Sequence, residues 1–143
     1  MKAKSTPKFL PGKTKAEPAE VTAKKNKYEL NGRFWISCNQ ETFLGFGRVV
    51  LLERIKEYGS ITKAAASMKM AYRHAWQLVD SMNRLSPKPL VVSTVGGKGG
   101  GGASLTTEGE KAIKTFWSFY HQFQQLLNSL ATEFEVKNKK EGL

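Results

Sequence analysis

The stretch GSITKAAASMKMAYRHAWQLVDSMNRL (Gly59–Leu85) decides the fold, because it holds two helical patterns with almost no linker between them. The Ser60 hydroxyl is well placed to cap a short, alanine-rich helix over 61–68, since it can accept from backbone N–H groups two or three residues on. A brief turn at Lys69-Met70 leads into an amphipathic helix over 71–85. Two helices joined by so tight a turn predict a helix-turn-helix unit.

The flanking segments extend this unit on both sides. An apolar helical arc over 49–58 predicts a helix before it, which Gly59 ends as a left-handed C-terminal residue. After it, 90–95 is rich in β-branched residues and predicts a strand, and 103–105 can return as its partner. We therefore expect a mainly α fold with a small β wing and one winged helix-turn-helix domain over 28–105.

Further upstream, apolar and polar residues alternate, which predicts a strand over 33–38 and leaves 28–31 open. Asn31-Gly32 offers a turn that would make this region a short hairpin. The last helix is expected over 106–135, capped by Thr106 or by Thr107, in the latter case with Glu110 completing a capping box.

That last helix carries an apolar seam with alternating spacings of three and four, typical of an a/d heptad repeat. A parallel stripe lies one residue earlier, at Ala112, Phe119 and Leu126. One stripe can pack on the chain's own domain and the other on a partner, so we expect a two-fold dimer. The expected dimerisation residues are Leu51, Ile113, Phe116, Tyr120, Phe123, Leu127 and Leu130.

Charge indicates the kind of partner. The sequence has 23 Lys and Arg against 12 Asp and Glu, a net charge of +11, which favours a polyanion, with an anionic membrane as the competing reading. The lysine- and proline-rich residues 1–27 are expected to be a disordered basic tail, and 136–143 a second disordered tail. No apolar run reaches the ~20 residues of a membrane span, and the N-terminus lacks a secretory signal.

The few cysteines and histidines indicate the cellular compartment and whether a metal site is expected. A single cysteine fits a reducing cytoplasm, where we expect the protein to be. Cys38, His74 and His121 are too scattered for metal-ligand spacing, and no nucleophile or carboxylate pair converges. We expect no enzyme activity, no metal and no cofactor.

The helix over 71–85 has two distinct faces. Ala75, Val79 and Met82 are spaced to face a core, and the opposite face can read base edges or phosphates in a major groove. Trp76 stays open between a core position and a DNA contact. The candidate DNA-binding residues on these two helices are Ser60, Thr62, Lys63, Lys69, Tyr72, Arg73, Trp76 and Gln77.

Six glycines in seven positions, interrupted by Lys98, follow the predicted strand. A phosphate-binding loop of an NTPase would need Ser or Thr after this lysine, where Gly99 stands. As the tip of a wing, the bare backbone at Gly99 and Gly100 can lie against a sugar–phosphate wall while Lys98 reaches a phosphate. The other interpretation is a plain surface hairpin.

Several motifs together are similar to one known family. They are Leu44-Gly-Phe-Gly-Arg48, Gly59-Ser-Ile-Thr-Lys-Ala-Ala65, Tyr72-Arg-His-Ala-Trp76, Met82-Asn-Arg-Leu85, Pro89-Leu-Val91, Gly96-Gly-Lys-Gly-Gly-Gly-Gly-Ala103 and Leu105-Thr106. In order and spacing these resemble the N-terminal, LysR-like domain of the ModE-type, molybdate-responsive transcriptional regulators, over residues 30–130. The resemblance implies a bacterial winged-helix dimer on operator DNA, with dimer contacts from the first and last helices.

Two departures from that family matter. Ala71 stands where members commonly have Ser, so a hydroxyl that caps the helix or contacts phosphate is missing. Family members also carry C-terminal molybdate-binding domains, and because the sequence ends at Leu143 we do not expect molybdate binding by this chain. Two other functions stay open: a dimerising interaction module without operator binding, and a sequence-indifferent nucleoid-associated protein.

Overall fold

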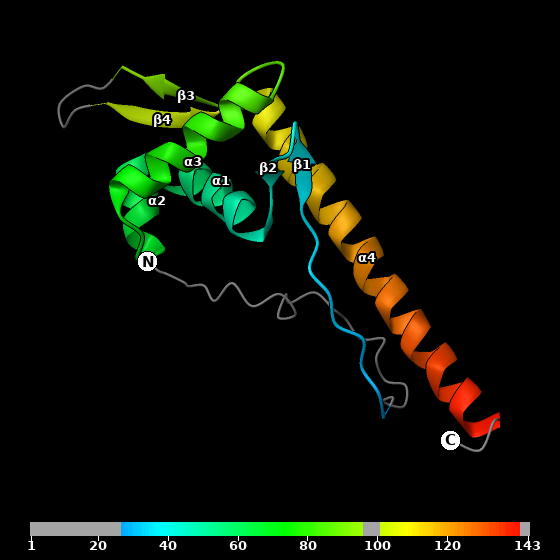
Figure 1. Ribbon diagram of the computed structural model, residues 1–143. Helices are drawn as coiled ribbons and strands as arrows, with labels where there is room; N and C mark the ends of the chain where they lie inside the picture. Colours follow the sequence, from blue (N-terminus) through cyan, green and yellow to red (C-terminus); the bar gives the residue numbers. More distant parts are fainter. Residues whose placement is uncertain (1–26, 96–100, 141–143) are drawn as a thin grey trace.

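The computed structural model describes residues 27–95 and 101–140 and shows a small helical body from which one long helix extends (Figure 1). The two predicted tails, apart from Lys27 and residues 136–140, lie outside the described residues, as do Lys98, Gly99 and Gly100. The elements follow in the order β1 (Ile36–Cys38), β2 (Glu41–Leu44), α1 (Phe46–Tyr58), α2 (Ile61–Ser67), α3 (Tyr72–Leu85), β3 (Val91–Thr94), β4 (Gly102–Leu105) and α4 (Thr107–Lys140).

The N-terminal hairpin lies further along the chain than its sequence indicates, and the strand expected over 33–38 forms only at Ile36–Cys38. β1 pairs antiparallel with β2, a strand that the alternating pattern did not predict. The turn between them is Asn39-Gln40, both with positive φ of 52° and 66°. The turn predicted at Asn31-Gly32 is therefore wrong. Gly32 instead lies close to α4, where a Cβ would make a tight contact of 3.0 Å with the Phe123 ring.

Helices α1, α2 and α3 begin and end close to where the sequence predicts. Gly59 closes α1 in the left-handed conformation with φ of 67°, and its N–H donates to the Ile55 carbonyl over 2.8 Å. The Ser60 side chain accepts from the Lys63 backbone N–H at 3.0 Å and so caps α2. Lys69 has a φ of 55° in the turn that leads to α3. The predicted short turn is thus confirmed.

The core lies where α1, α2, α3 and the first turns of α4 meet. Its largest fully buried side chains are Phe116, Leu51, Leu52, Ile55, Met82, Leu90 and Val49. Small residues let the helices approach closely, since Ala64 and Ala65 of α2 and Ala75 of α3 are almost completely buried.

The β3–β4 hairpin projects from this body above α2 and α3 (Figure 1). Its register pairs Val91 with Leu105 and Thr94 with Gly102. The hairpin is also bonded to the helices at its base, because the Ala103 N–H donates to the Gly59 carbonyl over 3.0 Å. Both predicted strands are confirmed to within a residue or two.

Helix α4 is capped by Thr106, whose hydroxyl accepts from the Gly109 N–H at 3.0 Å. The alternative capping box through Thr107 does not form, because Thr107 is already the first residue of the helix, and the Glu110 carboxylate pairs with Lys56 of α1 at 3.0 Å. The helix continues to Lys140, so the expectation of a disordered tail is wrong for residues 136–140.

Residues 27–35, which we call the strap, run alongside α4 (Figure 1). The Lys27 backbone N–H donates to the Glu135 carboxylate at 3.1 Å, and the Tyr28 ring meets the Phe134 ring edge-on at 5.0 Å. At the other end of the strap, Phe34 packs against both Phe116 and Phe123. The chain therefore covers part of the α4 seam with its own N-terminal residues.

Candidate nucleic-acid interface

The exposed face of α3 combines two aromatic rings with two polar side chains. Tyr72 and Trp76 lie one helical turn apart and are 51% and 48% exposed. Arg73 and Gln77 have the same spacing and are also exposed. Together the four line an open hollow of about 420 Å³. An arginine and a glutamine offer hydrogen bonds to base edges, and aromatic rings offer apolar contact to sugars and thymine methyl groups.

The buried face of α3 fixes how this surface is presented. Ala75, Val79 and Met82 are at most 5% exposed, as their spacing predicts. This core contact sets the rotation of the helix, so Tyr72 and Arg73 point outward. Trp76 is half exposed on the same outward face, which removes the interpretation that it belongs to the core.

The N-terminal end of α3 carries no acidic residue in its first turn and no side-chain cap at Ala71. First-turn N–H groups have no partner within a helix, and the helix dipole makes this end positive. Such an end is a ready site for a phosphate. Ala71 adds no hydroxyl to this end, and the side chain of the neighbouring Arg73 is exposed.

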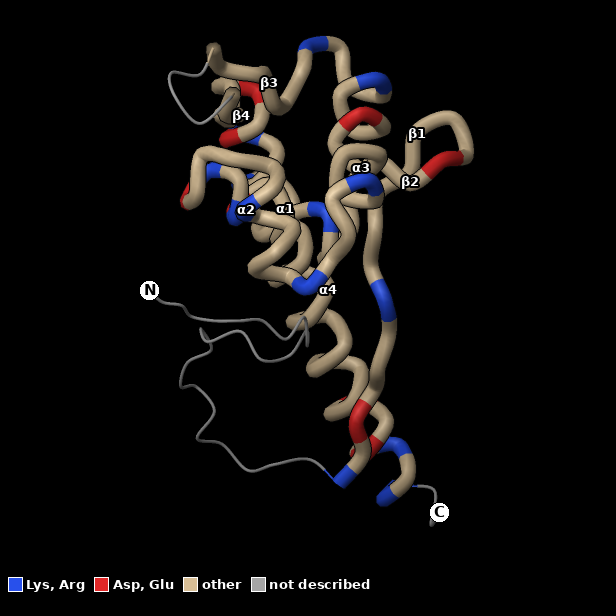
Figure 2. The backbone as a smooth tube through the Cα atoms, turned by 90° about the vertical axis from the view of Figure 1, so that its left-hand side faces the viewer, with Lys and Arg blue, Asp and Glu red and all other residues tan. Residues whose placement is uncertain are grey.

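The remaining candidates lie on α2 and at its two ends. Thr62, Lys63 and Lys69 are exposed, and Ser60 is half-buried because its oxygen caps α2. Figure 2 shows basic positions along α2 and α3 of the helical body. The arrangement presents positive charge beside the polar and aromatic face of α3, which suits a polyanion.

The C-terminal end of α3 is held from two sides. Arg84 forms a double hydrogen bond with the Glu41 carboxylate of β2, at 3.2 and 3.0 Å, and this bond lowers the pKa of Glu41. Asn83 bonds the backbone at the start of β3. Sequence reasoning quoted both residues only as part of a motif. Their partners could not be read from the sequence, because the strand with Glu41 was not predicted and no local pattern shows which side chain bonds the backbone at Leu90 and Val91.

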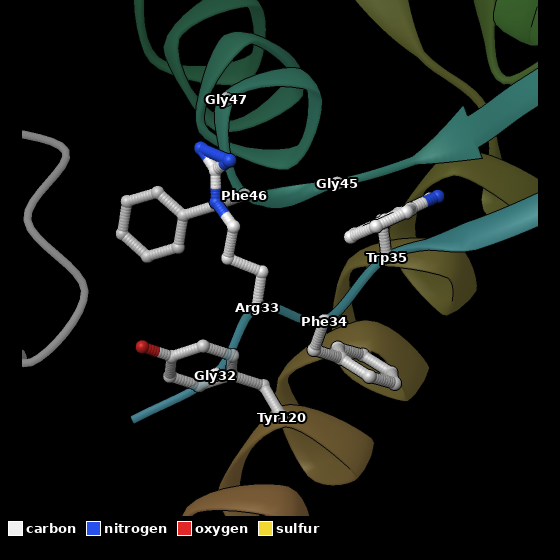
Figure 3. A pocket seen from close by; sticks show the side chains of 8 residues that line it. All are labelled: Gly32, Arg33, Phe34, Trp35, Gly45, Phe46, Gly47 and Tyr120. Atoms are coloured by element: carbon white, nitrogen blue, oxygen red, sulfur yellow. The ribbon is translucent and has the colours of Figure 1, made fainter. Parts of the chain in front are cut away.

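A second hollow, of about 610 Å³, lies between the strap, the start of α1 and α4 (Figure 3). Arg33 and the rings of Phe34, Trp35, Phe46 and Tyr120 line it. Tyr120 is 5% exposed, its hydroxyl has no hydrogen-bond partner among the described residues, and burial raises its pKa. The hydroxyl is enclosed by the protein and is not a group that the hollow offers to a ligand.

The expected dimerisation residues fall into two sets. Leu51 and Phe116 are fully buried and Tyr120 nearly so, inside the protomer's own core. These three side chains have almost no exposed surface, so the expectation that they contact a partner directly is wrong. The others are partly exposed: Ile113, Phe123, Leu127 and Leu130. Ile113 packs against the core and Phe123 against the strap, which leaves Leu130 the most exposed of the expected dimerisation residues.

The larger exposed apolar surface on α4 combines Phe119 and Leu126 of the parallel stripe with Leu130 of the seam, and we call these three residues the exposed stripe. Phe119 is 47% exposed, Leu126 53% and Leu130 37%. Their spacing of seven and four places them on one face of the helix. A protein surface that places several large apolar side chains in one row is typical of a contact with another protein chain.

Neither metal chemistry nor membrane insertion is indicated by the described part of the chain. Within residues 27–95 and 101–140, no three His, Cys, Asp or Glu side chains gather as metal ligands would. In the same ranges, every helix is too short or too polar to cross a membrane.

Comparison with known proteins gives a consistent set of relatives. The chain is 39% identical to the molybdenum transport protein ModE of Azotobacter vinelandii over 99 residues, which are 69% of this chain and 37% of that protein. It is 41% identical to the transcriptional regulator ModE of Haemophilus influenzae over 81 residues, 57% of this chain and 32% of the relative. The chain is a homologue of the ModE-type regulators. A third ModE, the DNA-binding transcriptional dual regulator of Escherichia coli, is 38% identical over 81 residues, 57% of this chain and 31% of that protein.

The match covers more than half of this chain but only part of each ModE relative. The chain spans about a third of the length of the curated ModE relatives that it matches. No protein-family model matches the chain. The resemblance drawn from the sequence motifs is confirmed by these ModE relatives.

Proposed function

We propose that the chain is a sequence-specific DNA-binding transcriptional regulator, a non-enzyme that binds operator DNA as a dimer through a winged helix-turn-helix domain. The observation that carries this proposal is the outward face of α3, where Tyr72, Arg73, Trp76 and Gln77 stand together beside basic positions. The names of the ModE relatives in Haemophilus influenzae and Escherichia coli support a regulator that binds DNA.

In this proposal α2, the turn and α3 are the helix-turn-helix, and α3 is the recognition helix in the major groove. Arg73 and Gln77 hydrogen-bond base edges or phosphates, and Tyr72 and Trp76 contact sugars or thymine methyl groups. Ser60, Thr62, Lys63 and Lys69 face the phosphate backbone where the first helix of the motif crosses it.

The β3–β4 hairpin is the wing of this domain. Lys98, Gly99 and Gly100 stand between the two strands in the sequence, outside the described residues. A cation and side-chain-free backbone at this point of the chain suit contact with the sugar–phosphate wall. A loss of Lys98 is expected to weaken binding to all sequences alike and to lower the salt dependence by about one unit.

The dimer forms in this proposal through the exposed apolar stripe of α4. Phe119, Leu126 and Leu130 would pair with the same residues of a second copy, because a two-fold axis makes the contact self-complementary. The dimer would present two recognition helices to a pseudo-palindromic site. We place the protein in the cytoplasm, at the bacterial nucleoid, as its proposed partner requires.

The test is binding of the purified chain to a random pool of duplex DNA, followed by sequencing of the retained fraction. The proposal expects an enriched palindromic motif for the wild type and a relaxed motif for Arg73→Ala. Lys139→Ala, at the far end of α4, removes the same charge and serves as control. Retention without an enriched motif would favour a nucleoid-associated protein, and no retention would favour an interaction module. Either outcome would overturn the proposal.

A further inference from the structure

Asn83, near the end of α3, reaches the first residues of the wing with its side chain. Its Nδ2 donates to the Val91 carbonyl at 2.9 Å, and its Oδ1 accepts from the N–H groups of Leu90 and Val91 at 2.8 and 3.2 Å. One half-buried amide thus makes three hydrogen bonds to two consecutive residues, Leu90 just before β3 and Val91 at its start. Both polar ends of the amide have partners, so its orientation is fixed.

These bonds occupy the side of β3 that faces away from β4. In an antiparallel ladder, alternate residues direct their N–H and C=O groups away from the partner strand. Val91 does so, and Asn83 takes the place that a further strand would have. Leu90 turns its carbonyl the other way, where it accepts from the Thr106 N–H at 2.9 Å.

The second strand of the wing is held by different means. The Ala103 N–H of β4 donates to the Gly59 carbonyl at 3.0 Å, and a Cβ on Gly102 would come within 2.8 Å of the same oxygen. The base of the wing is therefore bonded from three directions: by the Asn83 side chain of α3, by backbone of the α1–α2 turn on β4, and by the Thr106 hydroxyl before α4, which donates to the Pro89 and Leu90 carbonyls at 2.7 and 3.2 Å. Of these, Asn83 is the side chain that joins the wing to α3.

We propose that Asn83 is a positioning residue of the DNA-binding surface, which holds the wing at a set orientation to the recognition helix so that both engage one duplex together. The inference rests on the proposed function. When the wing is held fixed relative to α3, both can contact one duplex without a further loss of conformational entropy. A wing that pivots must instead be ordered when the DNA binds, which weakens binding. Asn83 itself touches no DNA in this scheme.

The decisive experiment is a double-substitution cycle between Asn83→Ala and Lys98→Ala, with affinity for the enriched DNA motif as the readout. In the wild-type background, we expect Lys98→Ala to weaken binding about fivefold, the loss of one contact to a phosphate. In the Asn83→Ala background the same substitution should weaken binding less than about twofold, because the wing no longer adds to affinity. Likewise, Lys98→Ala should lower the salt dependence of DNA binding in the wild-type background and change it little in the Asn83→Ala background.

Two controls separate positioning from loss of fold. Asn128→Ala removes an exposed asparagine from α4 and should leave the full effect of Lys98→Ala. Asn83→Asp keeps the acceptor oxygen but cannot donate to Val91, so it should give the same loss of coupling while it stays helical by circular dichroism. The cycle is measured at a temperature where each variant is fully folded. If Asn83→Ala does not fold, the cycle is measured with Asn83→Asp in its place.

Equal effects of Lys98→Ala in all backgrounds would overturn the inference, as would unchanged binding by both Asn83 variants. Failure of the proposed function is a different result, because the wild type itself would then enrich no motif. A simple loss of stability lowers the melting temperature of Asn83→Ala but leaves the effects of the two substitutions additive.

Discussion

Helices α3 and α4 both expose large apolar side chains, yet their surroundings differ. On α3, Tyr72 and Trp76 alternate with Arg73 and Gln77, and α3 has no acidic residue in its first turn. On α4, Phe119 and Leu126 lie in a row of apolar residues, and the helix begins with two glutamates. An exposed ring beside a guanidinium suits a polyanion with flat bases, whereas several apolar side chains on one helix face suit another apolar surface. The exposure of an apolar side chain therefore does not indicate by itself whether nucleic acid or protein is the better partner. The polar groups beside it do.

The largest expected effect is a difference in stability between substitutions on the buried and exposed faces of α4. Phe116→Ala removes a fully buried ring and is expected to lower the free energy of unfolding by about 3–5 kcal/mol. Phe119→Ala, three residues along, removes a ring that is 47% exposed and should cost the protomer far less. Urea denaturation of both variants at a concentration where each is monomeric measures the difference. Similar losses would mean that the exposed stripe is not a free surface.

A charge on the exposed stripe tests its proposed partner. Leu126→Asp would bring a carboxylate from each copy into an apolar contact, so we expect the dimer dissociation constant to rise more than about 100-fold, or roughly 3 kcal/mol. Gln125→Asp adds the same charge on a different side of α4 and should leave the dimer intact. Sedimentation or light scattering would show the shift, and a dimer unaffected by Leu126→Asp would exclude this face.

On α3, the corresponding change is Arg73→Ala. If the guanidinium bonds a base with two hydrogen bonds, DNA affinity should fall by about 1–3 kcal/mol and discrimination at one base pair should relax. The dimer should be unchanged, since Arg73 lies on α3. Fluorescence anisotropy with a set of single-base operator variants measures both quantities. A uniform loss across all variants would reassign Arg73 to phosphate contact.

The smallest effect concerns the aromatic part of the same face. Trp76→Ala should weaken DNA binding by about 1 kcal/mol, the value of the apolar area that the ring would bury against a sugar or a methyl group. Trp35→Ala removes another exposed tryptophan, from the strap, and should leave DNA affinity unchanged. Equal losses in the two variants would show that tryptophan exposure, and not its place on α3, governs the result.

Local signals predicted most of the helical body correctly. Gly59 and Ser60 fix the end of α1 and the start of α2 through groups within a few residues, so sequence alone was sufficient. The core face of α3 was likewise predicted, because Ala75, Val79 and Met82 follow the helical period.

The failures share a dependence on distant contacts. Asn31-Gly32 has the composition of a hairpin turn, but Gly32 serves the approach to Phe123 of α4, and the turn falls at Asn39-Gln40. The heptad seam of α4 was assigned to a partner, whereas the chain's own core and strap cover much of it. Periodicity shows that a face is apolar but does not show what covers it.

The strap also bears on the order of folding. Lys27 and Glu135 are bonded although 108 positions separate them in the chain, whereas contacts such as that of Arg54 with Ser67 in the α1–α3 body join near neighbours. Closing a long loop costs more chain entropy than closing a short one, and pairings between distant positions form late. Hydrogen exchange should therefore show the outer end of the strap opening first and the α1–α3 body last.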